Sequence, residues 1–195
     1  MNTRAQVGKL RRELRFSKSA IEKNLQALGK SISEMKPLVD AFMNSEGLLG
    51  LYGSELLILE KALGIDFGIP AIELVGELVS VKKVPAATSI SYGYLSTTER
   101  VTNLGLVAIG FSDGIPRSAT NKVRVSIAGK NYQTVGRIAM DQLVVDLGKD
   151  SPPTGIEVTF FTADFPLEEW ARVSDFTQLE ILGRITSRVD RVWSK

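Results

Sequence analysis

The part of the sequence from Ala71 onward consists of short runs of β-type residues separated by glycine, proline and asparagine. Many short strands with such turns favour an all-β barrel or sandwich. Residues 128–131, Ala-Gly-Lys-Asn, have hairpin chemistry, because glycine and asparagine tolerate the positive φ that tight turns need. We therefore predict a mainly β fold, a small barrel or sandwich, with strands over residues 71–84, 89–92, 103–110, 123–127, 132–135, 142–146, 157–161 and 184–193.

Helical patterns occupy the first part of the chain. Residues 1–36 are predicted to be helical, with Ser17 or Ser19 as an N-cap and Gly29 closing the helix. A further short helix is predicted over residues 54–63. The mainly β fold is thus expected to follow a short helical N-terminal segment.

The length limits the architecture that the chain can hold. Its 195 residues suit one domain with an appendage, whereas a complete (β/α)8 barrel typically takes ~250 residues. We divide the chain into a helical N-terminal segment, residues 1–66, and a β domain, residues 67–195, in which two short helices are predicted over residues 166–172 and 174–182. Because the apolar runs end short of the ~18 residues that cross a bilayer, we expect a soluble, cytoplasmic protein with no membrane partner.

The composition excludes several classes of chemistry. The sequence contains no cysteine and no histidine, which rules out disulfides, thiolate chemistry, Cys/His zinc sites and Ser-His-Asp triads within the chain. Acid–base chemistry is left to Asp, Glu, Lys and Tyr, and no metal site is predicted.

Positive charge gathers near the amino end, at Arg4, Lys9, Arg11, Arg12, Arg15 and Lys18, although the net charge is only +2. Such a run is typical of a nucleic-acid arm, a targeting peptide or a solvated helix face. Because Glu13 interrupts the run, we favour a solvated helix face or a frayed terminus and expect no nucleic-acid partner.

Three motifs follow one another in the β region: Ser91-Tyr92-Gly93, Gly110-Phe111-Ser112-Asp113-Gly114 and Gly136-Arg137-Ile138-Ala139-Met140-Asp141-Gln142. Tyr92 is a candidate for proton transfer, but a phenol is a poor base unless cationic neighbours or hydrogen bonds stabilise the phenolate. A strand-end tyrosine with its hydroxyl in water is the structural alternative. Asp113-Gly114 is also a common turn pair, and Arg137 and Asp141 suit an internal ion pair.

Together the three motifs resemble the carboxy-terminal domain of the pyridoxal-phosphate-dependent alanine racemases, over roughly residues 70–193. The resemblance implies a small, mainly β domain. It implies that Tyr92 transfers the α-proton on one face of the substrate, at the cofactor held by the opposite subunit of a homodimer. It also implies that the Met140 backbone N–H holds the substrate carboxylate, and that Asp141 and Phe111 lie at the substrate entrance, where Phe111 replaces the family's tyrosine.

The cofactor lysine of that family lies on an amino-terminal (β/α)8 barrel, within a Lys-Ala-x-Ala-Tyr-Gly-type motif that nothing in this sequence matches. Two upstream stretches resemble the beginning and the end of that barrel: Ser19-Ala20-Ile21-x-x-Asn24-Leu25 and Gly50-Leu51-Tyr52-Gly53. The resemblance therefore implies a racemase relative in which most of the barrel is missing.

Several residues depart from the family's pattern. Leu179 occupies the position of a tyrosine that contacts the cofactor phosphate, and Glu46 that of an arginine facing the pyridine nitrogen. Lys36, Lys82 and Lys83 lack the sequence context of a desolvated Schiff-base pocket. We therefore expect no cofactor in the isolated chain, and pyridoxal phosphate is implied by the resemblance alone.

Two functions remain open. The first is a racemase-like protein that is silent alone and supplies Tyr92 in trans, to a homodimer partner or to a chain that bears the cofactor barrel. The second is a non-enzymatic binding module that has kept the fold. Under both functions, a domain built to pack on a barrel exposes apolar surface when the barrel is missing. We expect residues 1–66 or a second copy of the chain to cover that surface.

Overall fold

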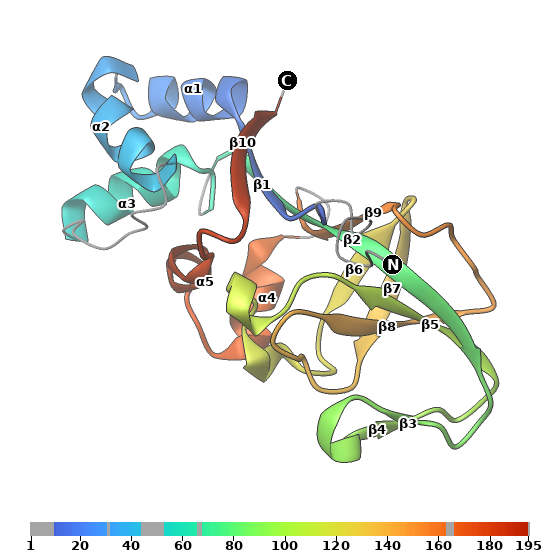
Figure 1. Ribbon diagram of the computed structural model, residues 1–195. Helices are drawn as coiled ribbons and strands as arrows, with labels where there is room; N and C mark the ends of the chain where they lie inside the picture. The colour runs from blue at the N-terminus through green and yellow to red at the C-terminus, as the bar shows by residue number, and fades with distance from the viewer. Residues whose placement is uncertain (1–9, 31, 44–52, 66–67, 163–165, 195) are drawn as a thin grey trace, which may run out of the picture.

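A computed structural model describes residues 10–194 apart from residues 31, 44–52, 66–67 and 163–165. Six antiparallel strands form a closed barrel, in which the last strand of the series pairs with the first (Figure 1). The mainly β fold predicted from the sequence is confirmed. In sheet order the strands are β2 (Ile72–Val84), β5 (Thr102–Val107), β8 (Leu143–Gly148), β7 (Lys130–Val135), β6 (Arg124–Ile127) and β9 (Glu157–Phe161).

Strand β2 is the longest of these strands and pairs with two barrel neighbours, β9 and β5. Its part from Leu74 to Glu77 pairs with β9, and its part from Leu78 onward pairs with β5. Both ladders contain a register shift, and a Cβ at Gly76 would lie 3.1 Å from the Phe160 ring. The irregular pairing and the missing side chain allow β2 to bend around the core and close the barrel.

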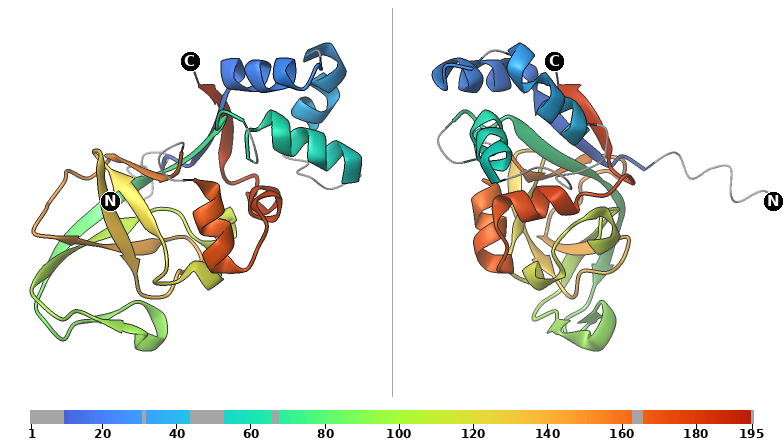
Figure 2. Two further views of the ribbon diagram at one scale, coloured as in Figure 1. Left: turned by 180° about the vertical axis from the view of Figure 1, so that it is seen from behind. Right: turned by 90° about the vertical axis from the view of Figure 1, so that its left-hand side faces the viewer.

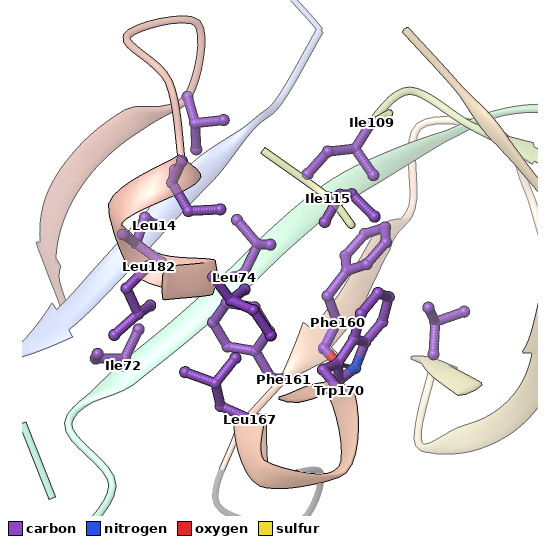
Figure 3. Packing of buried hydrophobic residues seen from close by; sticks show 14 of the residues in the cluster. Leu14, Ile72, Leu74, Ile109, Ile115, Phe160, Phe161, Leu167, Trp170 and Leu182 are labelled. Carbon is purple, nitrogen blue, oxygen red and sulfur yellow. Dashed lines mark hydrogen bonds between the residues drawn. The ribbon is translucent and has the colours of Figure 1, made fainter. Parts of the chain in front are cut away.

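Large apolar side chains from the strands and from two helices form the core (Figure 3). The rings of Phe160 and Trp170 lie 5.8 Å apart, and the Trp170 indole N–H donates to the Phe160 carbonyl oxygen at 2.9 Å. Trp170 belongs to α4 (Leu167–Ser174), and the next helix, α5 (Gln178–Arg184), contributes the buried Leu182. Both helices were predicted, and each lies within a few residues of its predicted range.

Residues 13–17 were predicted as helix, and this prediction is wrong: they form strand β1 (Glu13–Ser17). β1 lies between β2, to which it runs antiparallel, and β10 (Asp190–Ser194), to which it runs parallel. Leu14 and Phe16 are buried and their neighbours are not, which is the period-two pattern of a strand. β10 is also shorter than the predicted strand over residues 184–193, because α5 extends to Arg184.

Arg11 and Arg15 do not lie on a solvated helix face, whereas Lys18 is exposed at the start of a helix and Arg4 and Lys9 lie outside the described residues. Arg15 Nη2 lies 2.5 Å from Glu157 Oε2 and 3.0 Å from Glu13 Oε2, and Arg11 Nη1 lies 3.3 Å from the same Glu157 oxygen. The hydrogen bond with Glu157 raises the pKa of Arg15 above its ordinary value, against the opposing effect of burial. These cations therefore attach β1 to the neighbouring strands.

Three helices lie together beside β1 and β10: α1 (Lys18–Ala27), α2 (Ile32–Met43) and α3 (Gly53–Ala62). Ser17 caps α1, as one of the two predicted candidates, by accepting the Ala20 N–H at 3.4 Å. The buried Asn24 joins α1 to the chain after α3, because its amide donates to the Ala62 and Ile69 carbonyl oxygens and accepts the Ile69 N–H. α2 runs past residue 36, where helix was predicted to end.

A small hairpin, formed by β3 (Ser89–Ile90) and β4 (Ser96–Thr97), projects from the barrel at the end remote from α1, α2 and α3 (Figures 1 and 2). None of the helices in the described ranges has the length and apolar character that spanning a membrane requires. The division at residues 66 and 67 stays a prediction, and β1 on one side of it pairs with β2 and β10 on the other.

Candidate functional site

Tyr92 lies at the tip of the β3–β4 hairpin, with 74% of its surface exposed. It begins a 3-10 turn, Tyr92–Tyr94, rather than ending the predicted strand. No hydrogen bond joins its hydroxyl to any residue that the structure describes. Gly93 follows with φ +73°, and a Cβ there would lie 3.4 Å from the Arg137 guanidinium. A cation of the third motif thus lies beneath the turn that presents the phenol.

The third motif also supports the base of this hairpin. Gly136 has φ +76°, and a Cβ there would lie 2.7 Å from Ile90 Cγ2 and 2.9 Å from Ser91 Cβ, so the two backbones approach as only glycine allows. The Ser91 hydroxyl donates to the Arg137 carbonyl oxygen at 2.6 Å. The first and third motifs, some forty residues apart in the sequence, are therefore in direct contact.

The second motif is joined to the third through its backbone. Phe111 N–H donates to the Ala139 carbonyl oxygen at 3.0 Å, and Ser112 N–H donates to the Met140 carbonyl oxygen at 2.9 Å. A Cβ at Gly110 would lie 2.4 Å from both carbonyl oxygens, so this approach also depends on glycine. Among the described residues none accepts a hydrogen bond from the Met140 N–H, which leaves that donor available to a ligand.

A buried carboxylate holds these two loops together. Asp113 is fully buried, and its Oδ2 accepts the Gly110 N–H at 2.8 Å. Its Oδ1 lies 3.2 Å from Arg188 Nε and 3.6 Å from Arg12 Nη1. Burial raises the pKa of Asp113 above its ordinary value, while the Gly110 hydrogen bond and the two arginines oppose the shift.

The same arginines reach the exposed Asp141. Arg188 Nη2 lies 2.7 Å from Asp141 Oδ1, and Arg12 donates to the Ala108 carbonyl oxygen at 2.7 Å and the Asp141 carbonyl oxygen at 3.4 Å. Asp141 thus pairs with Arg188, and not with Arg137 as the sequence suggested. Sequence reasoning missed Arg12 and Arg188 as parts of the site, because each is distant in sequence from the motif that it holds.

Several exposed apolar side chains belong to the three motifs and to the loops next to them. Six large side chains on the hairpin and the adjoining loops are at least 40% exposed. Helices α1 to α3 lie at the end of the molecule remote from the β3–β4 hairpin and do not cover it (Figure 2), and a single exposed apolar surface stays a prediction. We call these six residues the hairpin patch: Tyr92, Tyr94, Leu95, Val101, Phe111 and Met140.

Four of the residues weighed for cofactor binding lie among the described residues, and their surroundings are as follows. Lys36 on α2 and Lys82 and Lys83 on β2 are exposed, whereas a Schiff-base lysine needs a desolvated pocket. Leu179, half-buried on α5, offers no hydroxyl to a phosphate. Glu46 and the stretch from Gly50 to Tyr52 lie outside the described residues.

The fold and its linked loops define a small β-barrel domain that presents an exposed tyrosine and an unpaired backbone donor at one end. The family model described as "Alanine racemase, C-terminal domain" matches residues 71–193. The chain belongs to the alanine racemase family, whose members depend on pyridoxal phosphate.

Individual relatives agree with this assignment. Alanine racemase from Streptomyces coelicolor is 44% identical over 133 residues, which are 66% of this chain and 34% of that protein. The structure of alanine racemase from D-cycloserine-producing Streptomyces lavendulae matches 75% of this chain and 38% of its own, with 41% identity and a TM-score of 0.63. Alanine racemase from Bartonella henselae, solved with covalently bound pyridoxal phosphate, matches 64% of this chain and 35% of its own, with 26% identity and a TM-score of 0.62. The chain thus spans about a third of the length of its relatives.

Proposed function

We propose that this chain is the tyrosine-bearing part of an alanine racemase-like enzyme and is inactive alone. In this proposal it supplies Tyr92 in trans to a partner whose (β/α)8 barrel holds pyridoxal phosphate. The observation that carries the proposal is the position of Tyr92, which is exposed at the tip of a hairpin that the third motif supports. A phenol placed there reaches outward from the chain, toward a site that a partner completes.

The proposed roles follow from the contacts of each residue. The Tyr92 hydroxyl takes or returns the proton at the substrate's α-carbon, and Arg137 lies against Gly93 in the turn that presents it. The Met140 N–H, which has no acceptor among the described residues, donates to the substrate carboxylate. Phe111 and Asp141 border the entrance, where Arg188 holds the Asp141 side chain. The partner supplies the cofactor and its lysine.

The first test is a mixing experiment. The purified chain is added to a barrel fragment of the Streptomyces coelicolor relative, loaded with pyridoxal phosphate and lacking the residues that match this chain, and alanine racemisation is measured. We expect activity in the mixture and not in either component. Tyr92→Phe removes the proton-transferring hydroxyl and is expected to lower the rate by at least about 100-fold.

Tyr94→Phe is the matched control, because Tyr94 lies in the same turn and is equally exposed at 74%. This variant is expected to retain the rate of the unmodified chain. Racemisation by the chain alone, with a visible absorbance band from lysine-bound cofactor, would contradict the proposal. So would a mixture that binds but stays inactive.

The departures at two positions favour a second candidate, a non-enzymatic module that binds a partner through the hairpin patch. Phe111 and Leu179 both lack the hydroxyl that the family's tyrosines carry, although both keep an apolar side chain. Under this alternative the chain binds the barrel fragment, or a second copy of itself, without racemisation. Sedimentation of the chain alone tests the homodimer, and Leu95→Glu within the patch is expected to abolish it. The cytoplasmic location stays a prediction, which a fluorescent fusion tests.

A further inference from the structure

A groove begins at Phe111 of the hairpin patch and extends to residues that have no role in the proposed function. It has a volume of about 580 Å³, and it opens between the loop that follows the second motif and the α4–α5 corner. This volume falls within the range of small-molecule sites. Its walls are partly apolar and contain no Asp or Glu side chain. The lining residues include Ile115, Pro116, Arg117, Phe176, Arg184 and Thr186.

Two arginine side chains at the groove each lie over an aromatic ring. The Arg117 guanidinium carbon lies 5.6 Å from the centre of the Phe111 ring, and that of Arg184 lies 4.2 Å from the centre of the Phe176 ring. A guanidinium stacked on a ring keeps its in-plane N–H groups free to bind an oxyanion. Neither arginine lies within 4 Å of a carboxylate oxygen of any described residue.

Nearby polar groups are already committed to other contacts. The Ser118 hydroxyl donates to the Ser174 carbonyl oxygen at 2.7 Å, and the Thr186 hydroxyl donates to the Ser112 carbonyl oxygen at 2.9 Å. The carboxylate of Glu180, one turn before Arg184, accepts the Thr177 N–H at 2.7 Å. The guanidiniums are therefore the donors that the groove offers to a ligand.

The walls of the groove are held in fixed relation. Gly114 has φ +116°, and a Cβ there would lie 2.5 Å from the Arg184 carbonyl oxygen, so the loop and the end of α5 are in direct contact. This contact sets the spacing between the two arginine-bearing elements before a ligand arrives. A site with fixed walls loses less entropy on binding than one that must be ordered.

We propose that this groove binds a small organic anion through Arg117 and Arg184, with a carboxylate or phosphate group held by the guanidiniums and an apolar body against Ile115 and Pro116. Planar guanidinium groups pair with carboxylate and phosphate through two parallel hydrogen bonds. The proposed anion site shares Phe111 with the proposed substrate entrance, but it lies within this chain, so binding can be measured without a barrel partner. The ligand is a molecule other than the amino acid proposed to meet Tyr92.

The test is a titration of the ¹⁵N-labelled full chain, followed by nuclear magnetic resonance. Succinate and inorganic phosphate are the two probes, each added at constant ionic strength against sodium chloride, so that a carboxylate preference is distinguished from a phosphate preference. We expect saturable shifts of the amide signals of Arg117, Ser118, Arg184 and Thr186 with at least one probe. Arg117→Gln and Arg184→Gln are each expected to weaken binding about tenfold.

Arg124→Gln is the matched control, because Arg124 is exposed on β6, away from the groove, and its loss changes the net charge by the same amount. It is expected to leave the affinity unchanged. Shifts that do not saturate with either probe would overturn the proposal, as would an equal loss of affinity in the control variant. Unchanged signals from the barrel verify that each variant is folded, and Arg117→Lys, which keeps the charge without the planar fork, is expected to bind more tightly than Arg117→Gln.

Discussion

The two loops that meet at Met140 and the hairpin that carries Tyr92 are held in different ways. The Met140 loop is fastened by a buried carboxylate, two arginines from opposite ends of the chain and two backbone hydrogen bonds. The hairpin has the Ser91 hydrogen bond and the Gly136 contact at its base, while Tyr92 and Tyr94 at its tip are exposed. The backbone donor is thus held by contacts around its loop, whereas the phenol lies at the exposed tip of the hairpin.

Removing the buried carboxylate should have the largest effect on this arrangement. Asp113→Ala leaves Arg12 and Arg188 without their shared buried anion and removes the Gly110 acceptor. We expect a loss of about 3–5 kcal/mol in the free energy of unfolding, measured by urea titration. Asp141→Ala, which removes an exposed partner of the same Arg188, should cost about 1 kcal/mol or less. Equal losses in the two variants would show that the buried carboxylate is not the fastening group.

A smaller loss is expected from crowding the contact between the second and third motifs. In Gly110→Ala the new Cβ would lie 2.4 Å from the Ala139 and Met140 carbonyl oxygens, and neither backbone can move without breaking the hydrogen bonds beside it. We expect a loss of about 2 kcal/mol. Gly155→Ala is the comparison, because its Cβ meets no atom within 4 Å and only its φ of +84° is strained. That variant should lose about 1 kcal/mol, and a larger loss than in Gly110→Ala would contradict the crowding argument.

The hairpin should respond locally rather than globally. Ser91→Ala removes the hydroxyl that donates to the Arg137 carbonyl oxygen, a bond worth about 1 kcal/mol. Amide hydrogen exchange at Tyr92 to Tyr94 is expected to accelerate about fivefold, while exchange in β2 and β8 stays unchanged. Faster amide exchange throughout the barrel would show that the hairpin and the barrel open as one unit. The hairpin would then not be held separately from the rest of the domain.

Short runs of β-type residues between turn residues predicted most of the barrel, and strands such as β8 bury alternate side chains. Strand β1 shows the same alternation at Leu14 and Phe16, but its surroundings of arginine and lysine resembled a helix face. Its partner β10 lies at the other end of the chain, and no local pattern reports a pairing of that kind. Tertiary contact therefore decided the structure of a segment whose own propensity was ambiguous.

The candidate site shows the same division between local and distant information. Each motif was visible in the sequence, and the resemblance alone grouped them. The sequence did not reveal the role of Asp113 in the site, because its pattern predicted a turn residue. In the structure Asp113 is buried and faces two arginines, Arg12 from near the amino end of the chain and Arg188 from near the carboxyl end. The structure also shows that Gly110 and Gly136 are points where two motifs touch.

The smallest expected effect is a dependence of stability on pH that originates at Asp113. Burial raises its pKa above the ordinary 3.8, so the folded state binds this proton more tightly than the unfolded chain does. Its contribution to stability therefore grows as pH falls through the raised pKa, and is complete below 3.8. Asp150 and Glu180 act in the opposite direction, because hydrogen bonds from Tyr132 and from the Thr177 backbone lower their pKa values.

The Asp113→Asn variant separates these opposing effects. It removes the titration of Asp113 and leaves those of Asp150 and Glu180 in place. The difference in unfolding free energy between the unmodified chain and the variant should grow in favour of the unmodified chain as pH falls from about 7 to about 4. Urea midpoints across that range measure the difference. A difference that shrinks toward acid pH would mean that Arg12 and Arg188 outweigh burial and keep the carboxylate ionised, in which case the loop is fastened by ion pairs over the whole range.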